Sequence, residues 1–121
     1  MINVLIVDDS RLSCAAITNM IEKIEGYNVI DKSLNLLDLK DFLESQPKPD
    51  VVTMDYVLPG GTGIDACNLI WDKYPDIPII MISAEAVPDG ERAKLKIPSN
   101  LKIYIVKPVT PLKLEDAFKL I

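Results

Sequence analysis

Short apolar runs alternate with segments of helical periodicity along the whole sequence. The runs occupy residues 3–7, 27–30, 50–54, 77–82 and 102–106, and they are rich in Val and Ile. Strands that are apolar along their whole length are typical of parallel sheets that helices cover on both faces. The pattern therefore predicts an α/β fold, in which a (βα)5 unit forms a doubly wound, five-stranded parallel sheet.

Between the runs, apolar residues recur at steps of three and four, which places one face of each helix on a core. Thr110 as N-cap and Pro111 at the first helical position mark the start of the last helix. A helix within residues 88–97 is expected to be short, because Pro88 lies near its start and Pro98 just past its end. The residues predicted to face the core are Leu12, Ala16, Ile17, Met20, Ile21 and Ile24, then Leu36, Leu39, Phe42 and Leu43, then Ile64, Cys67, Trp71 and Tyr74, and finally Leu114, Ala117, Phe118 and Ile121.

Composition narrows the classes of function. A chain of 121 residues, 49% of them hydrophobic, suits a single domain over residues 1–121. No apolar run approaches the roughly 20 residues of a membrane span and the N-terminus lacks a secretion signal, so we expect a cytoplasmic protein without membrane contact. The net charge of -5 argues against direct binding of nucleic acid, and the absence of histidine excludes His-based triads and His-ligated metals. Cys14 and Cys67 lack CxxC spacing, which predicts reduced core thiols.

Polar residues stand directly after four of the five predicted strands. Asp8 and Asp9 follow the first strand and Asp55 follows the third. Ser83 follows the fourth strand and Lys107 the fifth. In sheets of this type, ligands bind outside the carboxyl ends of the strands. The five side chains are therefore predicted to share one edge of the sheet.

Three carboxylates at one edge suit Mg2+, which prefers about six oxygen ligands. Their charge is balanced to zero by Lys107 and one divalent cation. Asp55 is the better candidate for a nucleophile toward phosphorus, because Asp8 and Asp9 come as a pair and so suggest metal binding. Ser83 would then donate its hydroxyl to the new phosphoryl group.

Each of these residues also has a common structural explanation. Asp8 and Asp9 could cap the following helix, and Asp55 could open a turn that contains proline and glycine. Lys107 could be a solvated loop residue. Their coincidence at the ends of four different strands favours a functional site over these separate explanations.

The pattern resembles the receiver (response regulator phosphoacceptor) domain of bacterial two-component signalling, and the resemblance runs from Met1 to Ile121. It implies a flavodoxin-like fold with the sheet order 2-1-3-4-5. The family combines an acidic pair after the first strand, a phosphorylated Asp after the third, Ser or Thr after the fourth and Lys-Pro after the fifth. These positions fall on Asp8 and Asp9, Asp55, Ser83 and Lys107-Pro108.

The resemblance also implies a role for each ligand of the metal. Asp9 would bind Mg2+ directly, and Asp8 would assist through a water molecule. Asp55 would be both a metal ligand and the phosphoacceptor, and the carbonyl of Val57 would complete the protein ligands.

A switch is implied by the same resemblance. The charge of the phosphoryl group would recruit Ser83 and Lys107, and Tyr104 would follow Ser83 inward. This movement would reshape the face formed by the fourth helix, the fifth strand and the fifth helix. The family's Lys-Pro bond is cis, so a cis bond is expected before Pro108.

The implied function is a phosphorylation-activated signalling switch whose chemistry is limited to self-phosphorylation and self-dephosphorylation, rather than an enzyme. A histidine kinase or a histidine phosphotransfer protein would supply the phosphoryl group. A downstream output domain or protein target would read the phosphorylated state, and the reshaped face could also form a homodimer. The alternative is a pseudo-receiver that acts as a docking module without phosphorylation. The sequence leaves open whether the chain acts alone, with a slight preference for a fragment of a longer regulator.

Two departures from the family pattern affect these expectations. The family's "MPxxDG" loop reads "LPGGTG" at residues 58–63, where Thr62 and Asp65 can still cap the third helix. Val57 stands where many relatives carry a polar side chain that addresses the attacking water. We therefore expect slow self-dephosphorylation.

Two other classes of protein are less consistent with the sequence. Phosphatases of the haloacid dehalogenase type carry their nucleophile after the first strand in a DxD pattern, which "VDDSR" does not supply. A flavodoxin-like FMN carrier needs a phosphate cradle of Ser, Thr or Gly after that strand, whereas the loop here is anionic.

Overall fold

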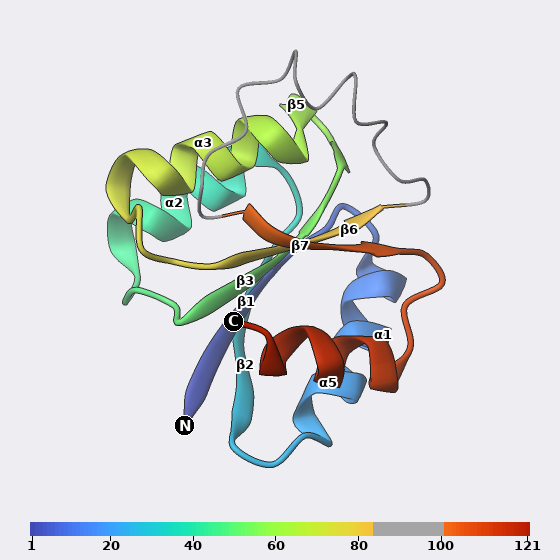
Figure 1. Ribbon diagram of the computed structural model, residues 1–121. Helices are drawn as coiled ribbons and strands as arrows, with labels where there is room; N and C mark the ends of the chain where they lie inside the picture. The colour runs from blue at the N-terminus through green and yellow to red at the C-terminus, as the bar shows by residue number, and fades with distance from the viewer. Residues whose placement is uncertain (84–100) are drawn as a thin grey trace.

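The apolar runs form the strands of one parallel sheet. The computed structural model describes residues 1–83 and 101–121 (Figure 1). The strands lie in the order β2-β1-β3-β6-β7, and every pairing is parallel. Counted along the chain this order is 2-1-3-4-5, so the predicted fold class and topology are confirmed. The strands of the sheet are β1 (Ile2–Val7), β2 (Tyr27–Ser33), β3 (Val51–Asp55), β6 (Ile79–Ser83) and β7 (Leu101–Val106).

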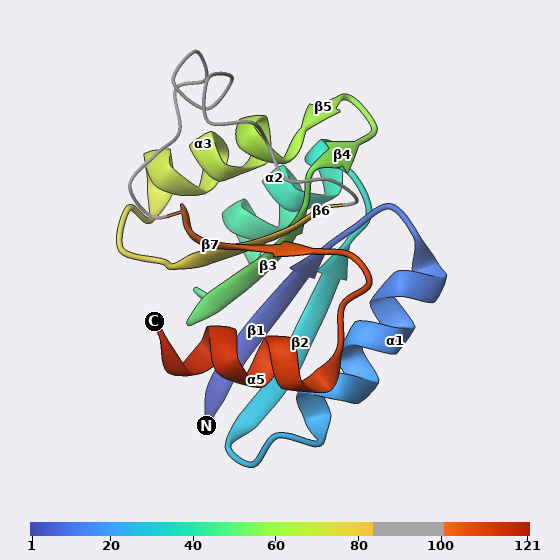
Figure 2. The same ribbon diagram turned by 45° about the vertical axis from the view of Figure 1, so that its right-hand side comes forward.

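Helices cover both faces of this sheet. α1 (Arg11–Glu22) and α5 (Pro111–Lys119) lie on one face, and α2 (Leu36–Ser45) and α3 (Gly63–Lys73) lie on the other, as Figures 1 and 2 show. The helix expected within residues 88–97 lies outside the described residues. No described helix has both the length and the apolar character that crossing a membrane requires.

Side chains of the central strand β1 alternate between two cores. Leu5 and Val7 pack with residues of α2 and α3, whereas Val4 and Ile6 pack with residues of α1 and α5. All four side chains are buried. Burial on both faces of the sheet is the reason why the strand sequences are apolar throughout.

Thr53 is a polar residue inside the core on the α1 and α5 side. Its register partners are Ile6 and Ile80, and its exposed fraction is 1%. Within the described part of the chain, its buried Oγ1 has no hydrogen-bond partner. A hydroxyl buried without a partner costs about 1–3 kcal/mol, so this position weakens the fold.

Polar N-caps start the described helices. In each of them the N-cap side chain accepts a hydrogen bond from the backbone N–H three residues later. Thr62 and Asp65 form a reciprocal capping box, as the sequence predicts. The predicted start of the last helix, with Thr110 as N-cap and Pro111 in its first turn, is also confirmed. The N-caps are Ser10, Asn35, Thr62 and Thr110.

The core-facing stripe of α1 differs from the prediction. Leu12 is 83% exposed and Ala16 is exposed as well, whereas Cys14, Ile17 and Ile21 are buried. Both sets satisfy a spacing of three and four, but they lie on neighbouring stripes of the helix. Only the stripe that contains Ile17 and Ile21 faces the sheet, so the prediction for Leu12 and Ala16 was wrong.

The last turns of α3 and α5 differ in the same way. Trp71 is 36% exposed, because α3 turns its neighbour Ile70 into the core. Ile121 is 41% exposed and lies two residues beyond Lys119, the last residue of α5. The other residues predicted to face the core are buried or half-buried.

Two strand features were not predicted. β2 continues beyond residue 30 to Ser33, and Asp31 and Lys32 pair with Leu5 and Ile6 of β1 after a register shift. As an edge strand it tolerates exposed charged side chains. A short antiparallel hairpin of β4 (Val57–Leu58) and β5 (Gly61–Thr62) follows β3, at the carboxyl end of the main sheet (Figure 2).

Candidate phosphoacceptor site

Backbone pairing brings three of the predicted site residues to neighbouring strand ends. Asp55 ends β3 opposite Ile82 of β6, and the next residue of β6, Ser83, pairs with Val106 of β7. The backbone N–H of Lys107 donates to the carbonyl oxygen of Ser83 at 2.7 Å. Asp55, Ser83 and Lys107 therefore lie at the carboxyl edge of three adjacent strands.

The acidic pair reaches the same edge from β1, which is the neighbour of β3. The backbone N–H of Asp8 donates to the carbonyl oxygen of Ser33 at 3.0 Å, so the loop after β1 stays aligned with β2. Ser10 caps α1, and its Oγ accepts from the backbone N–H of Ser13 at 3.1 Å. Neither Asp8 nor Asp9 is the N-cap.

The three carboxylates converge. One carboxylate oxygen from each of Asp8, Asp9 and Asp55 lies within 4.8 Å of the other two. Asp8 is 2% exposed and Asp55 8%, whereas Asp9 is exposed to solvent. Within residues 1–83 and 101–121, this is the only group of three or more His, Cys, Asp or Glu side chains with that spacing.

This donor set fits a hard divalent cation. Carboxylate oxygens are the ligands that Mg2+ and similar cations prefer, and one solvent-exposed carboxylate leaves room for coordinated water. Three anionic groups this close together repel one another unless a positive charge lies between them. The acidic triad of Asp8, Asp9 and Asp55 can therefore bind a metal ion.

Burial and repulsion act together on Asp8. Desolvation by burial is the largest cause that raises the pKa of the Asp8 carboxyl group, and the charges of Asp55 and Asp9 raise it further. A hydrogen bond from the backbone N–H of Ser10 to Oδ1 at 2.9 Å and the charge of Lys107 oppose this shift. The folded chain thus disfavours the ionised form of Asp8 when no cation is bound.

Lys107 supplies the positive charge that the described chain brings to Asp55. Its Nζ lies 3.6 Å from Oδ1 of Asp55, and about a third of the lysine side chain is exposed, against 10% for the Asp55 side chain. This distance allows an ion pair but is long for a hydrogen bond. The peptide bond between Lys107 and Pro108 is cis, as the resemblance implies.

Gly63 lets the hairpin close against the site. A Cβ at this position would lie 2.4 Å from the carbonyl oxygen of Asp55 and 2.9 Å from Sδ of Met81. The backbone N–H of Gly63 also donates to the carbonyl oxygen of Tyr56. Only glycine permits this close approach, which fixes the end of β3 where Asp55 lies.

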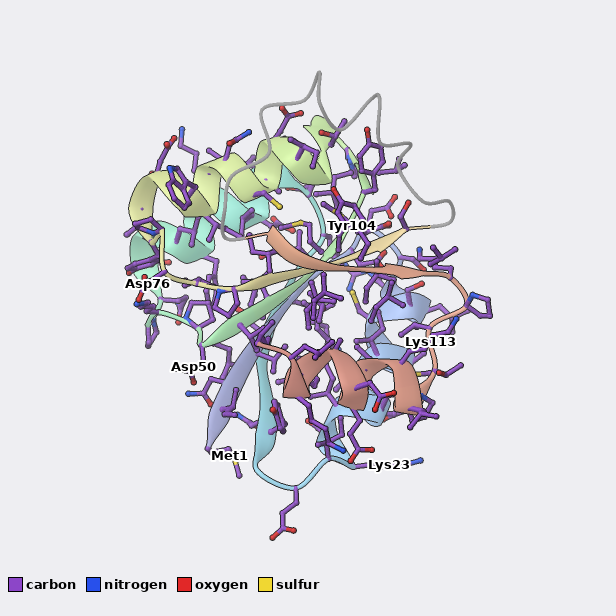
Figure 3. All side chains as sticks on the ribbon, viewed as in Figure 1. Met1, Lys23, Asp50, Asp76, Tyr104 and Lys113 are labelled. Atoms are coloured by element: carbon purple, nitrogen blue, oxygen red, sulfur yellow. The ribbon has the colours of Figure 1, made fainter. Side chains whose placement is uncertain are left out.

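The two remaining predicted site residues are Val57 and Tyr104. Val57 begins β4 and its side chain is 68% exposed. Tyr104 on β7 pairs with Met81 and packs, half-buried, against the core on the α2 and α3 side (Figure 3). The metal-ligand role of the Val57 carbonyl and the switch role of Tyr104 stay predictions.

Two contacts of the site were missed in the sequence. The close packing of Gly63 on Asp55 depends on the hairpin, and the cluster of glycines in "PGGTG" was its only signal. The thiol of Cys14 donates to the carbonyl oxygen of Asp8 at 3.4 Å from the buried side of α1. Periodicity predicted Cys14 only as a core thiol.

Comparison with known proteins identifies the family. The model of the response regulator receiver domain matches residues 4–119. The chemotaxis protein CheY of Thermotoga maritima is 34% identical over 116 residues, which are 94% of this chain and 92% of CheY. The transcriptional regulatory protein YvrH of Bacillus subtilis is 32% identical over 93% of this chain, but the match spans only 45% of YvrH.

A solved structure agrees with these matches. The CheX-CheY-BeF3-Mg complex from Borrelia burgdorferi contains a chain 29% identical in sequence, with a TM-score of 0.84 over 98% of this chain and 87% of that one. The order of the sheet, the acidic triad and the match over residues 4–119 all lead to one conclusion. This chain belongs to the response regulator receiver domains of two-component signal transduction, which are signalling domains and not catalytic enzyme domains.

Proposed function

We propose that residues 1–121 form one receiver domain that is switched on when Asp55 accepts a phosphoryl group in a Mg2+-dependent reaction. The phosphoryl donor would be a phosphohistidine of a histidine kinase or of a histidine phosphotransfer protein. The observation that carries this proposal is the position of Asp55. Its buried carboxylate lies within 4.8 Å of a carboxylate oxygen of Asp8 and of Asp9, and 3.6 Å from the ammonium of Lys107.

The transfer follows from that position. A carboxylate oxygen of Asp55 would attack phosphorus while the bond from phosphorus to the imidazole nitrogen of the donor breaks. Asp8, Asp9 and Asp55 would hold Mg2+, with the carbonyl of Val57 as a further ligand. Magnesium, when bound, offsets negative charge on the phosphoryl oxygens. Lys107 would bind the same oxygens through its ammonium group.

The product would change the shape of the protein through charge. An added phosphoryl group carries about -1.5 to -2 charges, which would draw Lys107 and the hydroxyl of Ser83 toward it. Tyr104 packs beside β6, so an inward movement of Ser83 would give it space to follow. The surface that includes β7 and α5 would then differ between the two states and serve an output domain, a protein target or a second copy.

One related solved structure is consistent with a Mg2+-dependent phosphoacceptor site. The Borrelia burgdorferi complex contains CheX, CheY, beryllium fluoride and Mg2+. Beryllium fluoride resembles a phosphoryl group in shape and charge. The exposed apolar side chain of Val57, two residues after Asp55, further suggests slow self-dephosphorylation, because it offers no polar group to the attacking water.

The direct test is intact-mass measurement after incubation with acetyl phosphate and Mg2+. The wild-type protein should gain the mass of one phosphoryl group, and both Asp55→Ala and the wild type with EDTA should gain none. Asp9→Ala is the matched variant that retains the acceptor, and it should be phosphorylated only slowly. A wild type that stays unmodified would support the docking module without phosphotransfer instead.

A further inference from the structure

The first turn of α5 carries a residue of unexpected charge. Lys113 lies three residues after the N-cap Thr110, and its backbone N–H donates to Oγ1 of Thr110 at 3.2 Å. In α2 and α3 the equivalent position is Asp38 and Asp65. Each of these carboxylates accepts a hydrogen bond from a backbone N–H, either that of the helix N-cap or that of the residue before it. Only α5, among these three helices, has a cation there.

This placement is unfavourable for the helix itself. The N-terminal end of a helix carries a partial positive charge, so acidic side chains stabilise the first turn and cations weaken it. The first turn of α5 contains no acidic residue that could compensate. A residue that contradicts its local preference calls for an explanation elsewhere in the fold.

The explanation lies in the loop between β7 and α5. The Nζ of Lys113 donates to the carbonyl oxygen of Val106 at 3.3 Å and to that of Pro108 at 3.0 Å. Figure 3 shows Lys113 at the start of α5, beside this loop. The two carbonyl groups flank Lys107 on either side along the chain. Lys113 therefore bridges the two backbone carbonyl groups on either side of Lys107, the residue whose ammonium lies near Asp55.

We infer that Lys113 is a positioning residue, which holds the backbone of Lys107 so that its ammonium stays directed at the phosphoryl position on Asp55. The inference rests on the proposed function. The backbone N–H of Lys107 also donates a hydrogen bond to the carbonyl oxygen of Ser83 in β6. With Lys113 in place, the segment is fixed both to β6 and to α5. Displacements of a charged group by about 1 Å are enough to slow a reaction, which is why such support matters.

The arrangement separates Lys113 from the metal. Its contacts are with carbonyl groups beside Lys107, whereas the cation would be held by Asp8, Asp9 and Asp55. Loss of the Lys113 ammonium should therefore weaken binding of the phosphoryl group and leave binding of Mg2+ unchanged. A residue that merely stabilised the fold would affect both equally or neither.

The experiment compares Lys113→Met, Lys113→Arg and Lys119→Met. Lys119 lies on the same helix, is 70% exposed and pairs with Glu115 at 3.9 Å, so its removal changes the net charge equally without touching the loop. Calorimetry gives the affinity for Mg2+ and, at saturating Mg2+, for beryllium fluoride. Intact mass gives the rate of phosphorylation by acetyl phosphate. An ionic strength near 0.15 M limits long-range attraction to about 8 Å.

We expect Lys113→Met to lower both the beryllium fluoride affinity and the phosphorylation rate about fivefold to tenfold, which is the scale of a lost charged hydrogen bond. Its Mg2+ affinity should equal that of the wild type. Lys113→Arg should restore both quantities, and Lys119→Met should match the wild type. The inference is overturned if Lys113→Met behaves as Lys119→Met does, if it weakens Mg2+ binding to the same extent, or if arginine does not rescue it. A wild type that takes up no phosphoryl group refutes the proposed function instead.

Discussion

The charge state of the Asp8 carboxyl group affects the stability of the cation-free protein. Its pKa is raised in the folded state, so the folded chain holds this proton more tightly than the unfolded chain. Stability must then fall as the pH rises from the ordinary value of 3.8 through the raised pKa, and it stays lowered above that range. A bound cation would reverse the effect by favouring the ionised form.

Asp8→Asn should therefore stabilise the protein in EDTA at neutral pH, by roughly 1 kcal/mol, because it removes a buried charge beside two others. The amide oxygen can still accept the hydrogen bond from Ser10. Urea unfolding at pH 7 and pH 3 measures the difference in unfolding free energy between the variant and the wild type. This difference should vanish at pH 3. Asp9→Asn, at an exposed position, should change stability less. A loss of stability in Asp8→Asn would contradict the assignment.

Thr53→Val tests the unpaired hydroxyl in the core. Valine has the same shape and removes a buried polar atom, so the free energy of unfolding should rise by about 1 kcal/mol. Thr18→Val is the matched control, because Oγ1 of Thr18 donates to the carbonyl oxygen of Cys14 at 2.7 Å. Denaturant unfolding should show a higher free energy of unfolding for Thr53→Val and no increase for Thr18→Val. Equal effects at both positions would show that the hydroxyl of Thr53 is satisfied in solution.

Val57→Asn tests whether the apolar side chain shields the phosphoryl group. The amide of the introduced asparagine could hydrogen-bond the attacking water and so lower the activation free energy of dephosphorylation by about 1 kcal/mol. The lifetime of the phosphorylated protein should then shorten severalfold. The decay of phosphoprotein, followed by mass after removal of the phosphodonor, measures it. Val57→Ala is the apolar control and should retain the long lifetime. An unchanged lifetime for Val57→Asn would exclude the shielding role.

At the scale of elements, the hairpin after β3 fixes the end of the strand that carries Asp55. Gly63→Ala would push a Cβ into the backbone carbonyl of Asp55, so we expect a loss of about 1–3 kcal/mol in stability and weaker Mg2+ binding. Gly26→Ala is the matched control. Gly26 has φ of +87°, and a Cβ there meets nothing within 4 Å, so it should cost about 1–2 kcal/mol through backbone strain alone.

The measurement for both glycine variants combines urea unfolding with calorimetric Mg2+ titration. Gly26→Ala should bind Mg2+ as the wild type does, since Gly26 lies in the turn before β2. If Gly63→Ala is destabilised but binds Mg2+ with full affinity, then the hairpin does not position Asp55.

Sequence patterns predicted the elements that depend on local physics. Strand ends located Asp8, Asp9, Asp55, Ser83 and Lys107, because apolar runs and the residues after them are visible in the chain itself. The reciprocal cap of α3 was predicted for the same reason.

What could not be predicted depends on tertiary packing. The extra length of β2 follows from its register with β1, which no local pattern reveals. Two stripes of α1 fit a helical period equally well, and only contact with the sheet selects the one that contains Ile21 over the one that contains Leu12. The approach of Gly63 to Asp55 likewise exists only once the hairpin has folded back.

At the scale of the whole molecule, the parallel sheet does two things at once. Its buried strands form two cores, one under each helical layer, and its carboxyl edge gathers charged side chains from strands that are distant in sequence. The two cores hold the backbone of the site, while Lys107 is partly exposed and Asp9 is exposed to solvent. In the proposed function, a local change of charge at this edge would reach a surface that partners recognise.

A crystal structure of the protein grown with Mg2+ and beryllium fluoride would test the proposed phosphoacceptor site most directly. We expect beryllium bound to a carboxylate oxygen of Asp55, with Lys107 and Ser83 in contact with the fluorides and Mg2+ held by Asp8, Asp9 and Asp55. Beryllium on a different side chain, or Mg2+ bound away from the three carboxylates, would contradict it.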